Sequence, residues 1–107
     1  MKVEGGINFN IRIAGDNSQT VEVDIVSHFP DVFRHFTKDD FIVAGLGTQS
    51  SGSTGGWYGM SVEVSDYDSI RGVLILKGTR YYGGGGSGSY PGDWTQIEGE
   101  IYVINHK

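Results

Sequence analysis

The segment that most constrains the fold is residues 70–82, which read IRGVLILKGTRYY. Four consecutive apolar residues occupy its centre: Val73, Leu74, Ile75 and Leu76. Successive side chains of a strand point to opposite faces, so an unbroken apolar run predicts a strand that is covered on both sides. We therefore expect this segment to be the central strand of a sheet, with Leu74 and Ile75 both largely buried.

Five further segments have the pattern of strands. Apolar and polar residues alternate in the segments 7–13, 21–25, 57–65 and 97–103. This alternation is typical of strands with one buried and one solvent-facing side. A short apolar run at residues 41–44 predicts one more, brief strand. The sequence thus predicts a mainly β chain with five to six mostly antiparallel strands.

A turn cluster, Gly15-Asp16-Asn17-Ser18, separates the first two of these strands. Residues of these types tolerate the dihedral angles of tight turns. We therefore expect the strands at 7–13 and 21–25 to pair with each other as a hairpin.

The period changes between the second and third strands. Phe29, Phe33 and Phe36 are spaced i, i+4 and i+7, so they would share one face of a helix. Pro30 suits a first helical position. The pattern predicts one short amphipathic helix at about residues 30–37, which packs its phenylalanines on the sheet because so short a helix needs burial to form.

A chain of 107 residues has the size of one domain, so we expect residues 1–107 to form a single domain. The predicted elements fit a mainly β fold with minor α content. We expect a small antiparallel barrel, or a curled sheet, of five to six strands with the helix at 30–37 packed on it. A barrel of this size is filled by its own side chains.

Charge and composition narrow the function classes. Thirteen acidic and eight basic residues give a net charge of −5, which disfavours binding to nucleic-acid phosphates and to anionic membranes. The absence of cysteine excludes disulfides, thiolate metal sites and a cysteine nucleophile. No stretch has the length and apolar character of a membrane span or of a signal peptide. We expect a soluble protein, cytoplasmic by default, that does not bind a membrane.

Residues with catalytic or ligand-binding chemistry do not form a recognised motif. His28 and His35 are seven residues apart, whereas metal-binding pairs on one helix are spaced by four. Glu98 and Glu100 alternate with core residues, which is the pattern of a solvated strand face. The glycines of segment 83–89 lack the lysine of a phosphate-binding loop. We therefore predict no catalytic residues, no metal site and no cofactor.

Aromatic residues flank two glycine-rich segments, 45–56 and 83–92. Rings beside flexible glycine and serine are common in binding surfaces, because a ring brings a large contact area at a low cost in conformational entropy. The residues predicted to bind are Trp57, Tyr81, Tyr82, Tyr90, Asp93 and Trp94.

We therefore expect a small non-catalytic binding module whose loops engage a macromolecule, in the first place a protein, in an inhibitor-like or immunity-like role. A carbohydrate-binding module, with rings stacked on sugars, is one alternative. A small-molecule-binding barrel, enzymatic or not, is the other. The sequence leaves the partner and any homo-oligomer open.

Overall fold

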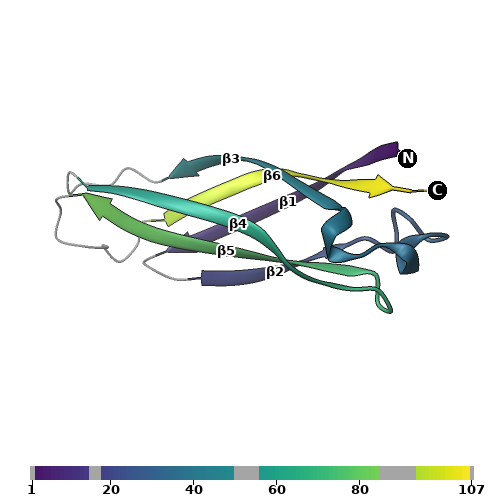
Figure 1. The fold of residues 1–107 in the computed structure, drawn as a ribbon. Coiled ribbons are helices and arrows are strands. Elements are labelled where there is room, and N and C mark those ends of the chain that lie inside the picture. The colour runs from purple at the N-terminus through teal and green to yellow at the C-terminus, as the bar shows by residue number, and fades with distance from the viewer. Residues whose placement is uncertain (1, 15–17, 50–55, 85–93, 107) are drawn as a thin grey trace.

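The computed structural model of the chain describes residues 2–14, 18–49, 56–84 and 94–106. Within these ranges, six antiparallel strands form two three-stranded sheets (Figure 1). In chain order the strands are β1 (Lys2–Ala14), β2 (Ser18–Asp24), β3 (Phe41–Gln49), β4 (Gly56–Asp68), β5 (Val73–Gly84) and β6 (Trp94–Asn105). One sheet has the order β1-β6-β3 and the other β2-β5-β4. The sheets face each other in a long, narrow sandwich of 50 × 22 × 18 Å.

The mainly β prediction is confirmed, but the predicted barrel is wrong. In the described part of the chain, no ladder of hydrogen bonds joins β1 to β2 or β3 to β4, so the sheets do not close on each other. The predicted hairpin of the first two strands is also wrong. β1 pairs with β6, where Ile7 lies opposite Ile101, and β2 pairs with β5, where Val23 lies opposite Leu74. Because β1 and β2 belong to different sheets, residues 15–17 link one sheet to the other.

The core fills the space between the sheets. Ile11, Leu74 and Ile101 are at most 1% exposed, and all six strands contribute buried residues. Burying an aliphatic side chain of this size stabilises the fold by about 1.5–3 kcal/mol. β5 is central in its sheet, as predicted, but Ile75 is only half-buried. Its side chain alternates with the buried Leu74 and Leu76 and therefore lies on the outer face, over which the described part of the chain places no further sheet.

Two β-bulges decide which side chains enter the core. The register of β1 shifts between Gly5 and Ile7, and that of β4 shifts between Val64 and Asp66. One extra residue moves every later side chain of a strand to the other face. In β4 this brings Tyr67 into the core, although the alternation before the bulge placed the even-numbered residues there.

The predicted helix at residues 30–37 is not present. Two short 3-10 turns, η1 (Phe33–His35) and η2 (Lys38–Asp40), occupy this region instead. Phe36 is 5% exposed and meets the ring of Phe29 edge to face at 5.5 Å, so the phenylalanines pack on the sheets as expected. Phe36 and Thr37 have extended backbone, with ψ of 151° and 168°, so the helical path is interrupted between the two turns. None of the helical turns in the described ranges is long and apolar enough to cross a membrane.

Gly72 connects this region to the turn between β4 and β5. Its carbonyl accepts hydrogen bonds from the backbone N–H groups of Ile25 and Val26, at 2.9 and 3.0 Å. Its φ of +68° favours glycine, and a Cβ at this position would lie 2.5 Å from Val26 Cβ and 2.8 Å from Phe33 Cδ2. The close approach of the two segments therefore depends on the missing side chain.

Candidate functional site

The predicted aromatic site lies at one end of the sandwich as far as the backbone is described. Trp57 and Tyr82 lie on the β4–β5 ladder, where Trp57 is opposite Gly83, and Trp94 is the first residue of β6. Tyr81 is opposite Gly59 on the same ladder. The side chains of these four residues, and all of Tyr90 and Asp93, lie outside the described part of the structure.

Strands of both sheets begin or end at this end of the molecule, which we call the loop end. In Figure 1, β1, β3 and β5 end there, and β2, β4 and β6 begin there. In the first sheet the register agrees, because Trp94 lies opposite Ala14 and Thr95 lies opposite Gln49. The three connections 15–17, 50–55 and 85–93 therefore join strands at the loop end. The role of the aromatic residues in binding stays a prediction.

A buried polar contact joins the sheets near the loop end. Arg80 on β5 is 2% exposed, and its Nε donates a hydrogen bond of 2.8 Å to Thr95 Oγ1 on β6. A buried cation is costly unless it is well hydrogen-bonded, so this contact holds its two strands in a defined relation. It links the two sheets next to the loop end.

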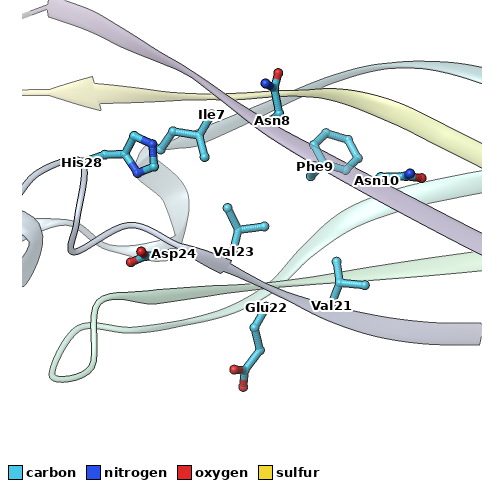
Figure 2. Close-up of a pocket in the computed structure, with 9 residues that line it drawn as sticks. All are labelled: Ile7, Asn8, Phe9, Asn10, Val21, Glu22, Val23, Asp24 and His28. Carbon is cyan, nitrogen blue, oxygen red and sulfur yellow. The ribbon is translucent and has the colours of Figure 1, made fainter.

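A groove runs along one side of the sandwich, between β1 and β2 (Figure 2). It has a volume of about 320 Å³. Ile7 and Phe9 of β1, together with Val21 and Val23 of β2, form its apolar floor. The polar residues of its rim are Asn8, Asn10, Glu22, Asp24 and His28, all exposed. A second cavity of about 260 Å³ shares Ile7 and His28 with the groove and extends it toward Glu4 and Phe29.

Both strands beside the groove are edge strands. Among the described residues, β1 pairs only with β6 and β2 pairs only with β5. In an edge strand, every second residue directs its backbone N–H and C=O away from the sheet, where another strand can bind them. The groove therefore combines an apolar floor with two lines of backbone hydrogen-bonding groups.

A small polar network lies at the rim of the groove. Ser27 Oγ donates to Asp24 Oδ2 at 2.5 Å, and the backbone N–H of Ser27 donates to Asp24 Oδ1 at 3.2 Å. These hydrogen bonds hold the pKa of the Asp24 carboxyl below its ordinary value. His28 Nδ1 lies 3.3 Å from Ser27 Oγ. A serine nucleophile needs the histidine between itself and the carboxylate, whereas here the serine lies between the two, so this network caps a turn.

The other candidate groups do not converge. Across the ranges that the structure describes, no three His, Asp or Glu side chains form a group that could hold a metal ion. His106 Nε2 lies 3.1 Å from Asp40 Oδ1. His106 is separated from the other two histidines by more than half of the sequence. Glu100 lies on β6 and bonds to Tyr102, whose pKa is raised by this hydrogen bond, while Glu63 lies on β4 in the opposite sheet.

The residues of the groove were missed by the sequence-based prediction. The predicted hairpin placed the strands at 7–13 and 21–25 side by side in one sheet, which leaves no space between them. The available signal was the polar residues that alternate with the apolar ones in both segments. That signal predicts a solvent-facing side, but not a gap between two sheets.

Comparison with known proteins does not assign the chain to a family. No protein-family model, no curated protein and no solved structure matches it. The function must therefore be argued from the geometry of the loop end and of the groove.

Proposed function

We propose that this chain is a non-catalytic binding module that engages a protein partner through its loop end. The observation that supports the proposal is the meeting of strands from both sheets at one end of the molecule. Three of those strands, β4, β5 and β6, carry Trp57, Tyr82 and Trp94 at the loop end. Residues on a rigid scaffold that presents loops are the usual location of binding surfaces.

The physical basis is the combination of aromatic rings with a fixed base. Trp and Tyr side chains bring a large contact area and have few rotatable bonds, so ordering them costs little entropy. Next to Tyr81 and Trp94 in the sequence, the Arg80–Thr95 hydrogen bond joins β5 to β6 across the two sheets. This hydrogen bond would keep the two strands in place when a partner binds at the loop end.

The net charge indicates the kind of protein partner. A charge of −5 on 107 residues attracts a basic protein at long range and speeds their association. Inhibitor-like and immunity-like proteins that cover a basic site act in this way. The two sheets do not close into a barrel, so a small-molecule function would need a pocket other than a barrel mouth.

The test begins with the exposure of the two tryptophans. Iodide and the neutral quencher acrylamide should both reduce the tryptophan fluorescence of the free protein. If both tryptophans are protected from both quenchers, the loop end offers no aromatic surface and the proposal fails.

The second step identifies the partner and the surface it uses. Proteins captured by the immobilised chain are identified by mass spectrometry, and the affinity of each purified candidate is then measured. Trp94→Ala should weaken binding by about 2 kcal/mol or more, while its unfolding remains cooperative. Tyr102→Ala, which removes an aromatic ring from the outer face of β6, serves as the control and should retain full affinity. Equal affinities of Trp94→Ala and Tyr102→Ala for the partner would contradict the proposal. If the chain binds to a glycan array and captures no protein, the carbohydrate alternative replaces the proposal.

A further inference from the structure

We infer that the groove between β1 and β2 receives an extended, basic segment of a protein partner, which pairs with β2 as an additional strand. This inference concerns the side of the sandwich and does not rest on the function proposed for the loop end. It follows from the edge position of β2 among the described strands, the apolar floor of the groove and the charges on its rim.

The edge of β2 lacks several of the features that prevent strand addition. Proteins protect exposed edges with charged side chains, above all lysine, with proline, with short strands or with a β-bulge, and the only charges on β2 are carboxylates, which a basic strand would neutralise. The sequence of β2, SQTVEVD, contains neither lysine nor proline, and its register with β5 is continuous. The opposite is true of β1, which is interrupted by the bulge between Gly5 and Ile7. β2 is therefore the better template for a seven-residue segment.

The floor of the groove would accept the inward side chains of such a segment. A strand added to β2 continues the sheet β2-β5-β4, so alternate side chains would point toward β1. There they would meet Ile7 and Phe9 and extend the apolar row of Val21 and Val23. The inward positions of the partner segment should thus be aliphatic.

The outward positions of the partner segment are selected by charge. Glu22 and Asp24 alternate with the valines of β2 and are both exposed. Among the described residues that line the groove and its extension there is neither lysine nor arginine, whereas Glu4 adds a third carboxylate. Glu22 makes an ion pair of 3.2 Å with Arg71, but both side chains are more than half exposed, so a partner cation can compete.

These carboxylates favour lysine or arginine on the partner strand. Residues directly opposite each other in an antiparallel pair have Cβ atoms about 4.5–5.5 Å apart, so opposite charges attract and like charges repel. A second copy of this chain is a poorer occupant, because it would bring another set of carboxylates and a further charge of −5 to the same groove. The expected segment alternates basic and aliphatic residues.

The experiment uses two synthetic peptides that differ only in charge. One is acetyl-Thr-Val-Lys-Val-Lys-Val-Thr-amide, and in the other both lysines are replaced by glutamate. Each is titrated into the full-length ¹⁵N-labelled protein at low salt. The basic peptide should bind roughly tenfold more tightly than the acidic one. It should shift the amide resonances of residues 18–24 and of residues 7–10.

Protein variants locate the charge that matters. Glu22→Gln should weaken the binding of the basic peptide by roughly threefold, because one cross-strand pair is lost. Glu63→Gln, which removes an exposed carboxylate from the other edge strand β4, is the matched control and should leave the affinity unchanged. An equal loss in both variants would show that only the net charge acts, and would overturn the inference.

Backbone pairing is tested with peptides that are N-methylated at one of two adjacent residues. Since only every second N–H of an added strand points to its neighbour, one methylated peptide should lose binding and the other should keep it. Equal binding of both, shifts confined to residues 41–45 or 60–68, or no saturable shift would each overturn the inference. Trp94→Ala should not change the peptide affinity, so the outcome here is independent of the proposal for the loop end.

Discussion

Tyr67 carries a hydrogen bond whose removal should have a measurable effect on stability. Its hydroxyl donates to the backbone carbonyl of Phe33 at 2.6 Å, and its ring centroid lies 4.8 Å from that of Phe41. The side chain is 9% exposed. This contact attaches the segment that contains η1 to the sheet β2-β5-β4.

Replacing Tyr67 with phenylalanine isolates the hydroxyl, because the ring and its packing are retained. The lost hydrogen bond accounts for about 1 kcal/mol. The carbonyl of Phe33 would keep only the 3.4 Å hydrogen bond from the N–H of Phe36, so part of the cost of a buried unpaired carbonyl is added. We expect a total loss of about 2 kcal/mol in the free energy of unfolding, with a melting temperature lower by roughly 10 °C.

The same substitution should change the dependence of stability on alkaline pH. Burial of the ring, with a smaller effect of Asp68, raises the pKa of Tyr67 to about 12. A group with a raised pKa in the folded state contributes stability that is complete below its unfolded pKa of about 10 and is lost as the pH rises toward the folded value. Tyr67→Phe lacks this contribution, so its deficit relative to the original protein should shrink between pH 10 and pH 12.

Urea unfolding followed by far-UV circular dichroism measures both effects. Tyr102→Phe is the control, because it removes a tyrosine hydroxyl that bonds to Glu100 on the outer face of β6. It should change the free energy of unfolding at pH 7 by less than about 0.5 kcal/mol. The reasoning is refuted if Tyr67→Phe unfolds at the same urea midpoint as this control, or if its deficit is constant across the alkaline range.

Three further predictions concern the packing and the acid stability of the fold. Gly72→Ala should destabilise the protein by about 2 kcal/mol or more, because the new Cβ would collide with Val26 and Phe33 at a positive φ. A melting temperature equal to that of the original protein would contradict this packing. Leu74→Ala should lower the free energy of unfolding in urea by about 2–5 kcal/mol, and Ile75→Ala should lower it clearly less, because only Leu74 is fully buried. Equal losses would place Ile75 in the core. A 2.8 Å hydrogen bond from the Thr37 N–H holds the pKa of the Asp40 carboxyl below its ordinary value. The ionised carboxylate therefore contributes stability above about pH 4, and this contribution is lost as the pH falls below that. Asp40→Asn should reduce the acid dependence of the free energy of unfolding, and an unchanged acid transition would exclude the effect.

The sequence by itself determined where the strands lie and which side chains they bury. The odd-numbered residues from Ile7 to Ile13 form the buried face of β1, as their alternation predicted. The apolar run at 73–76 identified a central strand. Both results depend on neighbours within a few residues, because the period of two is a property of the local backbone. Ile75 and Tyr67 are exceptions. A continuous apolar run does not show how much of the outer face is covered, and the alternation in β4 does not reveal the bulge that turns Tyr67 into the core.

Only the tertiary structure decided how the strands are combined. β1 pairs with β6, and Arg12 bonds to Gln96, which is 84 residues away in the sequence. A turn cluster at residues 15–18 suits a hairpin and a crossing between sheets equally well, so local chemistry could not choose between them. The phenylalanine spacing at 29–36 likewise allowed a helix, but packing of those rings against the ends of the sheets favours short turns. The groove between β1 and β2 exists because those two strands belong to different sheets. Their assignment to different sheets depends on pairing with β6 and β5, which are distant in the sequence.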